Sequence, residues 1–474
     1  MSANVLRVAV VGHTNTGKTS LLRTLTRDPG FGQVANAAGT TRHVEGVKLL
    51  IDGEALLELY DTPGLEDSMG LLDHLDQGHE RRFRDWLERI QQFLDSPEAH
   101  EEFEQEAKVL RQVLACHAVL YVIDARDRIL GKHQDELEIL ARCARPVVPV
   151  LNFVASPEAL TREWREHLSR ANMHAVTEFD TVVVAETGEL RLFEKLKSLL
   201  DPFADLLDRL IDDLRRRREN LRLASADLIA DLLLDVAAYR LVAPGASAET
   251  EQAMGLLKRT VREREQRCVD ELLTLHRFRS TDVASQTFPI EEGRWGLDLF
   301  SPVSLQQFGV RASGGAAAGA AAGLAVDVLS AGITLGVATA TGAALGALLF
   351  TAQQHGRRIA DRLRGFSELR ASDATLRLLA LRQIALARAL LRRGHAAQEQ
   401  IHLHAPTEAG QDWIRGRLPA PLGQAKLNPR WSRLDPQSRE DAADRQHARD
   451  QLAGLINAAL SQGIDSGRGD NRSE

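Results

Sequence analysis

The stretch "GHTNTGKTS" at residues 12–20 follows the apolar run "VLRVAVV" at 5–11 and decides the fold of the first part of the chain. It holds two glycines five positions apart, and Lys18 and Thr19 follow the second glycine. Glycines at this spacing let successive backbone N–H groups turn toward phosphate oxygens. The β-branched run before the loop predicts a buried strand, and the leucine spacing after it predicts a helix over 18–26. The sequence therefore predicts a phosphate-binding loop between a strand and a helix.

Apolar runs and helical patterns alternate outward from this loop as far as residue 200. We expect further strands at 44–51, 55–60, 118–125, 146–154 and 179–186. A turn at Asp52-Gly53 joins the first two of them. We expect helices at 133–143, from Ser156-Pro157 onward, and at 189–200. This alternation predicts a doubly wound α/β domain with a mostly parallel sheet over residues 1–200.

A helical insertion is expected to interrupt this domain at about 66–117. Apolar residues at helical spacing mark two amphipathic helices within it. The second of these is expected to begin at Ser96-Pro97, with proline at the first helical position. The first carries the apolar residues Phe83, Leu87, Ile90 and Leu94.

Length and composition limit what the chain can be. With 474 residues, 44% of them hydrophobic, it is long enough for two to four folded units. The net charge of −7 is mild, so no nucleic-acid partner is predicted. Three cysteines, far apart in the sequence, form no disulfide or zinc pattern and suit a reducing compartment. No basic region precedes the first apolar run, so we expect a cytoplasmic protein.

Long helical patterns without alternating strands follow Pro202, and helices are expected at 203–240, 247–277 and 356–395. The cluster "RRRR" at 215–218 follows Asp212 and Asp213, which favours ion pairs along a solvated helix over contact with nucleic acid. These patterns predict a mainly α-helical second half. Its parts are helical regions at 201–311 and 353–462, with a disordered tail at 463–474.

A segment rich in glycine and alanine separates these two helical regions at 312–352, and Asp327 is its one ionisable residue. Glycines recur in it at every fourth position, a spacing that lets two helices pack closely. As a helix it would extend roughly 60 Å, enough to cross a bilayer core of roughly 30 Å twice. We expect an apolar hairpin that turns at about 327–332. Contact of this hairpin with the inner membrane, and packing of the hairpin inside a soluble domain, are both consistent with the sequence.

The loop and the segment "LELYDTPG" at 57–64 carry the expected chemistry. Lys18 would reach the β- and γ-phosphates of a nucleotide, and the Thr19 hydroxyl would ligate Mg²⁺. Asp61 ends an apolar strand, where its carboxylate can hold the Mg²⁺ shell through water. Gly64 can donate its backbone N–H to the γ-phosphate.

Four motifs together resemble the small GTPases of the Era and TrmE type: "GHTNTGKTS", "GTTR" at 39–42, "DTPG" at 61–64 and "LYVIDAR" at 120–126. The resemblance covers about the first 155 residues and implies a P-loop GTPase domain that binds GTP and GDP with Mg²⁺. It also implies that a switch threonine, Thr41 or else Thr40, ligates Mg²⁺ together with Thr19 and Asp61. The nucleotide contacts it implies are Gly12, Asn15, Thr16, Gly17, Lys18, Thr19, Ser20, Asp61, Gly64 and Asn152.

The residues near the γ-phosphate indicate how hydrolysis would proceed. Leu65 stands where Ras-like enzymes carry the glutamine that orients the attacking water, and a leucine cannot do this. In the TrmE-like branch an asparagine of the loop helps hold a potassium ion, and Asn15 stands at the matching position. The resemblance thus implies Lys18, Thr41, Gly64 and Asn15 as catalytic residues and K⁺ as a second cofactor. The alternative for Asn15 is a turn residue with tolerant backbone angles.

The base-recognition motif departs from the family. The family reads guanine with Asn-Lys-x-Asp after the strand at 146–154, and this sequence has Asn152-Phe153-Val154-Ala155. The asparagine is present, whereas the lysine that stacks on the base and the aspartate that selects guanine are both replaced. The other motifs favour GTP, and ATP use stays an alternative.

The whole arrangement resembles a bacterial GTPase family whose C-terminal domain has no assigned function, and the similarity extends to 356–398. It implies a bacterial origin. The interpretation we favour is a GTP-hydrolysing switch that passes its nucleotide state through the insertion to the helical half and to an unknown protein effector. Two alternatives remain. One is a dynamin-like membrane protein that assembles with nucleotide, and the other is a nucleotide-binding module that hydrolyses little.

Overall fold

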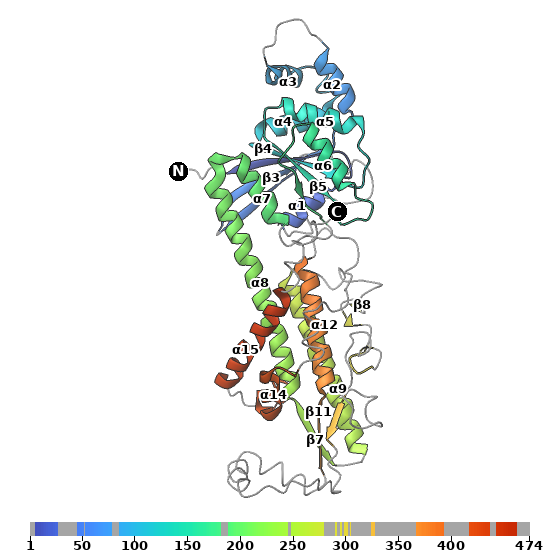
Figure 1. Cartoon of the computed structure of the whole chain (residues 1–474), viewed down its shortest axis with the longest axis vertical. Coiled ribbons are helices and arrows are strands. Elements are labelled where there is room, and N and C mark those ends of the chain that lie inside the picture. The colour runs from blue at the N-terminus through green and yellow to red at the C-terminus, as the bar shows by residue number, and fades with distance from the viewer. Residues whose placement is uncertain are drawn as a thin grey trace, which may run out of the picture. The chain divides into compact units, whose positions relative to one another are not determined.

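The computed structural model describes two compact units, Met1–Asn220 with Leu391–Glu399, and Leu221–Leu390 with Gln400–Glu474 (Figure 1). The described residues are 5–26, 45–51, 53–77, 85–181, 188–244, 248–278, 290–291, 294–295, 298–301, 304, 324–327, 366–392, 417–436 and 442–461. The two units are called unit 1 and unit 2 below, and each is described by itself.

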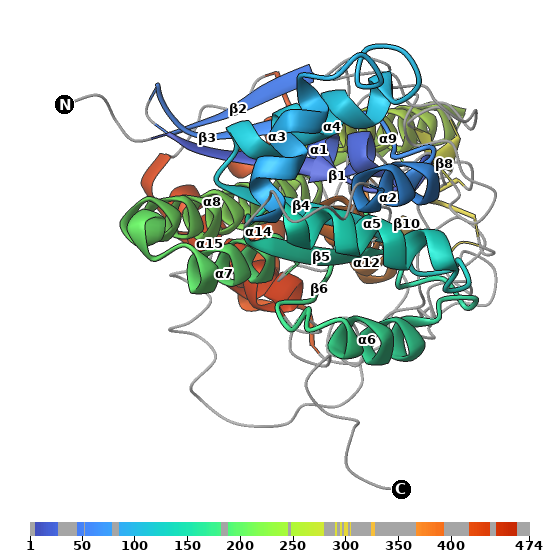
Figure 2. The ribbon, with the colours of Figure 1, turned by 90° about the horizontal axis from the view of Figure 1, so that it is seen from above.

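Six strands form the sheet of unit 1, in the order β2-β3-β1-β4-β5-β6 (Figure 2). Their bounds are β1 Leu6–Val11, β2 Glu45–Ile51, β3 Glu54–Asp61, β4 Ala118–Asp124, β5 Val147–Asn152 and β6 Thr177–Glu178. Neighbouring strands are parallel except β2 and β3, which form the antiparallel hairpin expected from the turn that contains Gly53. Val10 of β1 lies opposite Asp61 of β3 and Leu120 of β4. The predicted doubly wound, mostly parallel sheet is confirmed.

Helices cover both faces of this sheet because alternate strand residues point to opposite sides. Val8 and Val10 pack on one side with α1 (Lys18–Thr26), α7 (Gly188–Leu199) and the first turns of α8 (Ala204–Ala238). Ala9 and Val11 pack on the other side. The helices of that side are α2 Ser68–Asp76, α3 Trp86–Leu94, α4 Glu104–Ala115, α5 Gly131–Arg142 and α6 Thr161–Arg170.

The insertion differs from its prediction. Its described residues, 66–77 and 85–117, form three helices where two were expected, because α2 also forms, with the Asp67 side chain accepting a hydrogen bond from the backbone N of Gly70 at 2.8 Å. α3 lies where the first helix was expected, although Phe83 falls outside the described residues. The second helix begins at Glu104 and not at Ser96-Pro97.

One further expectation in unit 1 was wrong, and another lies largely outside the described residues. Residues 153–159 form turns, with Ser156 N donating to Phe153 O and Ala159 N to Ser156 O, so α6 begins at Thr161 and not at Ser156-Pro157. Of the strand expected at 179–186, residues 179–181 are not in a strand and 182–186 lie outside the described residues, while the two-residue β6 lies directly before them. Asp180 bonds Ala155 after β5, and Thr181 bonds Asn152 at the end of β5.

Unit 2 packs helices around a small antiparallel sheet of order β10-β11-β7. Its helices are the second half of α8, α9 Ala248–Leu275, α12 Asp373–Arg392, α14 Ala420–Leu427 and α15 Ala442–Ser461. The strands are β7 Arg240–Pro244, β10 Leu324–Asp327 and β11 Phe366–Ala371, and β8 Ile290–Glu291 pairs separately with β9 Arg294–Trp295. Single 3₁₀ turns precede α8 at Asp201–Phe203 and follow α14 at Pro429–Trp431.

The predicted mainly α-helical second half is confirmed, but it also contains strands that the sequence did not predict. β7 and β11 pair over five residues each, from Phe366 opposite Pro244 to Arg370 opposite Arg240. β11 occupies part of the range expected as one helix over 356–395, and α12 accounts for the rest that is described. Strands of five and six residues from distant parts of the chain stabilise each other only once they meet, which no local pattern reveals.

The segment 312–352 lies outside the described residues except for 324–327. These four residues form β10, with Leu324 opposite Ala371 of β11, and not the helix expected there. Within the described part of the chain, no helix is both long and apolar enough to cross a membrane.

α12 is the central helix of unit 2, because its residues are buried around most of its circumference. It carries Arg382, whose side chain is fully buried and donates to Glu265 of α9 at 3.3 Å and to Ser304 at 3.2 Å. The guanidinium also lies over the Trp295 ring, 4.8 Å from its centroid. Burial raises the pKa of Glu265, and the neighbouring Arg382 opposes this. A buried charge is thus paired and hydrogen-bonded, as a low-dielectric interior requires.

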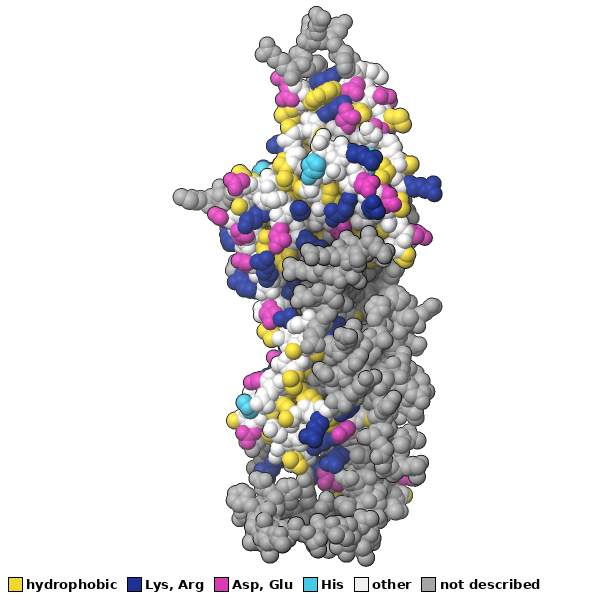
Figure 3. Space-filling model, viewed as in Figure 1, with side chains coloured by type: hydrophobic (Ala, Val, Ile, Leu, Met, Phe, Trp, Pro, Cys, Tyr) yellow, Lys and Arg dark blue, Asp and Glu magenta, His cyan; other side chains and the backbone are white. Residues whose placement is uncertain are grey.

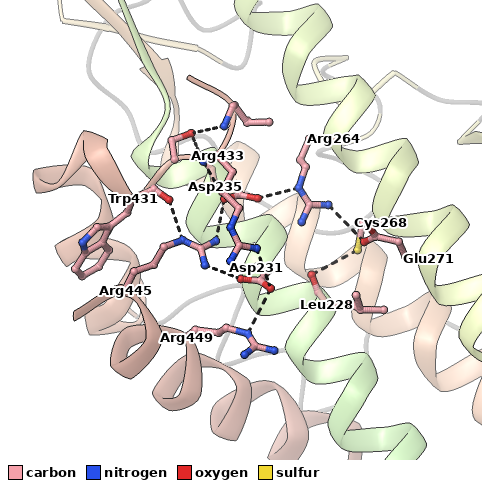
Figure 4. Close-up of polar contacts among 12 residues, drawn as sticks. Leu228, Asp231, Asp235, Arg264, Cys268, Glu271, Trp431, Arg433, Arg445 and Arg449 are labelled. Atoms are coloured by element: carbon pink, nitrogen blue, oxygen red, sulfur yellow. Dashed lines mark hydrogen bonds and ion pairs between the residues drawn. The ribbon is translucent and has the colours of Figure 1, made fainter. Parts of the chain in front are cut away.

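A second group of buried charges joins α8, α9 and α15 (Figure 4). Asp235 of α8 accepts hydrogen bonds from Arg264 of α9 and from Arg445 of α15, each at 2.9 Å. Arg445 also donates to Asp231 and to the Trp431 carbonyl at 2.9 and 2.8 Å. Opposite charges face each other throughout, so we interpret this group, named here the Asp235 network, as a structural connection between helices.

The arginine cluster at 215–218 is engaged in ion pairs, as predicted. Arg215 pairs with Asp212, Arg217 with Asp213 at 2.6 Å, and Arg218 with Glu189 of α7 at 2.7 Å. On the face seen in Figure 3, basic and acidic side chains of the described residues are interspersed. The cluster therefore belongs to a solvated helix whose charges are largely matched.

Candidate nucleotide-binding site

The loop between β1 and α1 has the backbone of a phosphate cradle. Gly12 and Gly17 adopt φ angles of 151° and 91°, and Asn15 adopts 67°. A Cβ on Gly12 would lie 2.3 Å from the Val122 carbonyl oxygen, so only glycine fits there. α1 begins directly at Lys18, which places its unpaired N–H groups and positive dipole end at the loop.

Lys18 is folded over this loop. Its ammonium is buried and donates to the carbonyls of Gly12 and His13 at 3.0 and 2.9 Å. Burial lowers the pKa of Lys18, while the nearby carboxylates of Asp61 and Glu136 act to raise it. A phosphate group would offer this ammonium a negatively charged partner in place of two neutral carbonyls, so binding of a polyphosphate is favoured.

Thr19 and Asp61 meet beside the loop. The Thr19 hydroxyl donates to Asp61 Oδ2 at 2.5 Å, and both residues are almost fully buried. The two side chains come from α1 and from the end of β3, the strand next to β1. Hydroxyl and carboxylate oxygens are the ligands that Mg²⁺ prefers. This pair therefore fits a magnesium ion that accompanies a nucleotide.

The segment after Asp61 lies against the phosphate loop. Thr62 is buried and donates to the Val10 carbonyl at 2.8 Å. A Cβ on Gly64 would lie 2.6 Å from the Thr14 hydroxyl oxygen and 3.0 Å from its backbone N, so the close approach requires glycine. The Leu65 side chain is fully buried in the core of unit 1. It does not orient water in this arrangement.

Asn152 connects the phosphate loop to the end of β5 and the segment after β6. Its side-chain amide donates to the Thr16 carbonyl at 2.9 Å. Its oxygen accepts from the backbone N of Phe153 at 2.9 Å and of Thr181 at 3.0 Å. The asparagine is fully buried, so its contacts hold three segments in one rigid frame.

The structure brings together most residues that the sequence selects for the site. Thr41 and its alternative Thr40 fall within 27–44, outside the described residues, and no partner is described for Ser20. The residues placed at the site are Gly12, Asn15, Thr16, Gly17, Lys18, Thr19, Asp61, Gly64 and Asn152.

Sequence reasoning missed a buried polar cluster behind the loop. Glu136 of α5 is fully buried, lies 3.2 Å from His13 Nδ1, and accepts from the Tyr121 hydroxyl at 2.6 Å. Burial, reinforced by Glu136, raises the pKa of Tyr121 well above its ordinary value. The residues come from a loop, a strand and a helix far apart in sequence, so no motif spacing could have indicated the cluster.

Two family models match the chain. Residues 7–153 match the model described as 50S ribosome-binding GTPase, and residues 165–454 match the domain of unknown function DUF3482. The second match covers more than half of the chain.

Two curated relatives are similar to parts of this chain. A tRNA modification GTPase MnmE of Pseudoalteromonas atlantica is 39% identical over 99 residues, which is 20% of this chain and 20% of that protein. The mitochondrial 5-taurinomethyluridine-[tRNA] synthase subunit GTPB3 of Danio rerio is 43% identical over 84 residues, 18% of this chain and 16% of that protein. The chain thus spans about a fifth of the length of the relatives it matches.

Solved structures similar to this chain include Era of Aquifex aeolicus bound to GDP and AlF4−. It is 17% identical, covers 57% of this chain and 89% of its own, and has a TM-score of 0.29. The G domain of the FeoB iron transporter of T. maritima is 21% identical, covers 40% of this chain and 96% of its own, and has a TM-score of 0.24. The DUF3482 model covers more than half of the chain and lies behind the match to the GTPase model, so the chain belongs to the family that carries the DUF3482 domain behind an Era/TrmE-type GTPase domain.

Proposed function

We propose that this protein binds GTP with Mg²⁺ at the loop of residues 12–20 and hydrolyses it to GDP and phosphate. The observation that carries the proposal is the joint placement of Lys18 and of the Thr19–Asp61 pair at the N-terminus of α1. Phosphoryl transfer needs little covalent chemistry from a protein and depends on positioning and charge stabilisation. Phosphate release from GTP, set against release from ATP, tests the proposal.

Each part of the site has a role in this reaction. The N–H groups of the loop and the Lys18 ammonium would bind the β- and γ-phosphate oxygens, whose negative charge must be stabilised in the transition state. Thr19 and Asp61 would hold the magnesium ion, which neutralises phosphate charge when bound. The Gly64 N–H would meet the γ-phosphate, and Thr41 is proposed as the further ligand of the metal.

Asn15 is proposed to hold a potassium ion that completes the site. Its φ of 67° places Asn15 at the turn of the loop. Because the Leu65 side chain is buried and apolar, another group must stabilise the transition-state charge and position the attacking water. We expect GTP turnover to be faster in KCl than in NaCl by about 10-fold or more, and this difference to vanish in Asn15→Ala. Phosphate release at equal ionic strength measures both effects. If GTP turnover were equal in KCl and NaCl, and unchanged in Asn15→Ala, Asn15 would serve only as a turn residue and not as a potassium ligand.

The insertion at 66–117 is proposed to transmit the nucleotide state. Glu106 of α4 is buried and accepts from the backbone N of Glu66 at 3.0 Å and of Asp67 at 2.9 Å. These two residues come two and three positions after Gly64, so a shift of Gly64 toward a γ-phosphate would pull on α4 through two charge-assisted hydrogen bonds. This coupling favours a nucleotide-dependent switch that acts on a protein effector.

Contact with the inner membrane through 312–352 is the remaining part of the proposal. Its support is the apolar, glycine-spaced composition of that segment. We expect the full chain to sediment with phospholipid vesicles and to stay bound after a carbonate wash. A chain that remains in the supernatant would contradict membrane contact, while tubulation of vesicles only with GTP would favour the dynamin-like alternative.

A further inference from the structure

The missing guanine-reading aspartate has a structural counterpart. Position 155, where the family motif carries that aspartate, holds Ala155. A carboxylate from elsewhere lies directly at this position, because Asp180 Oδ2 accepts a hydrogen bond from the backbone N of Ala155 at 2.9 Å. Asp180 follows β6 and is only 5% exposed. A carboxylate from a residue 25 positions later in the chain therefore contacts the backbone at the position where the family motif carries its aspartate.

Asp180 is fixed to the frame that holds the phosphate loop. The next residue, Thr181, donates its backbone N–H to the Asn152 side chain, and Asn152 in turn donates to Thr16 of the loop. β6 runs parallel to β5, so the segments that follow the two strands emerge at one edge of the sheet. Ligands of doubly wound folds bind at this edge, beyond the carboxyl ends of the strands.

An aromatic ring occupies the position of the family's base-stacking lysine. Phe153 adopts a φ of 57°, and its ring lies 3.3 Å from where a Cβ on Gly17 would be. The Arg126 guanidinium covers the ring at 4.1 Å from its centroid, and Asp124 holds that guanidinium through hydrogen bonds of 2.9 and 2.7 Å. The ring therefore lies between the phosphate loop and the Arg126 guanidinium, two residues before Ala155.

We propose that Asp180 selects guanine in this protein, in place of the aspartate absent at position 155. This inference rests on the proposed function and adds the residue that determines the base. A carboxylate has several acceptor positions, so Asp180 can keep the bond from Ala155 and accept from a base. Guanine offers N1–H and a 2-amino group to such an acceptor. Adenine offers an unprotonated N1 and no 2-amino group, so a carboxylate facing it is left without donors.

Asp180→Asn tests the inference with xanthine nucleotides. The amide oxygen can keep the bond from Ala155, while its nitrogen places a donor where the carboxylate had an acceptor. Xanthine carries an oxygen in place of the 2-amino group of guanine, so it suits this donor. We expect the variant to bind GDP about 10²-fold more weakly than the wild type and to bind xanthosine diphosphate more tightly than GDP. Competition of GDP, ADP and xanthosine diphosphate against a fluorescent guanine nucleotide, and against its xanthine counterpart for the variant, measures this on the full chain.

Glu178→Gln is the matched control, because it removes the same charge two residues earlier. Glu178 pairs with Arg165 of α6 at 2.7 Å and is half-buried, so its replacement should leave base preference unchanged. The inference is overturned if Asp180→Asn keeps the preference for GDP, or if it loses GDP and xanthosine diphosphate alike at an unchanged unfolding temperature. A wild-type chain that binds ADP as tightly as GDP would instead contradict the proposal of a GTPase.

Discussion

Replacing Lys18 with methionine is expected to lower GTP turnover by about 10²–10³-fold, the usual effect of removing one group that stabilises transition-state charge. Lys18 is the ammonium held at the loop, 3.0 and 2.9 Å from the carbonyls of Gly12 and His13. Methionine retains a flexible stem of similar length but cannot donate to a phosphate oxygen. Single-turnover phosphate release, together with the affinity for a fluorescent GTP analogue, measures the loss.

The fold should survive this substitution, because burial already disfavours the charged form of Lys18 and methionine suits a buried site. Lys48→Met on β2 serves as the control. That lysine pairs with Glu58 at 2.9 Å but is well exposed, so its removal should leave turnover within about twofold. A Lys18→Met protein that hydrolyses GTP at the wild-type rate would show that the loop is not the catalytic site.

Replacing Asp235 with alanine is expected to lower the free energy of unfolding of unit 2 by about 3–5 kcal/mol, the effect of breaking a buried ion pair from one side. Asp235 is 1% exposed and accepts hydrogen bonds from Arg264 and Arg445 (Figure 4). Alanine would leave both buried guanidinium groups facing an apolar interior without this acceptor. Denaturant titration, with hydrogen exchange followed in peptides of α8, α9 and α15, measures the change.

Asp227→Ala is the comparison for that experiment, since it lies on the same helix. Asp227 pairs with Arg449 at 3.0 Å, but its side chain is 42% exposed, so its loss should cost no more than about 1 kcal/mol. Equal destabilisation by the two variants would mean that the Asp235 network does not stabilise unit 2 through its burial. Hydrogen exchange distinguishes the units, because the Asp235 network lies wholly in unit 2.

The sequence by itself determined the phosphate loop and the sheet around it. A loop that turns on glycines, and strands that are apolar on both faces, are encoded by adjacent residues, so the sequence predicted β1, α1, β4 and β5 within two residues. The roles of Lys18, Thr19 and Asp61 could also be predicted from the sequence, because each of these residues lies at the end of a helix or strand that the sequence predicts.

The tertiary structure decided what depends on distant residues. β7 and β11 pair although more than 120 residues of sequence separate them. Glu136 of α5 lies 3.2 Å from His13 of the phosphate loop, and Asp180 after β6 accepts a hydrogen bond from Ala155 after β5. In each case the stabilising contact forms only after folding has brought the two segments together. The sequence of either segment alone does not indicate which other segment it will contact. The sequence therefore predicted the loop that we propose binds phosphates, and only the fold brought the Asp180 carboxylate to the backbone of Ala155, where the family motif carries its base-reading aspartate.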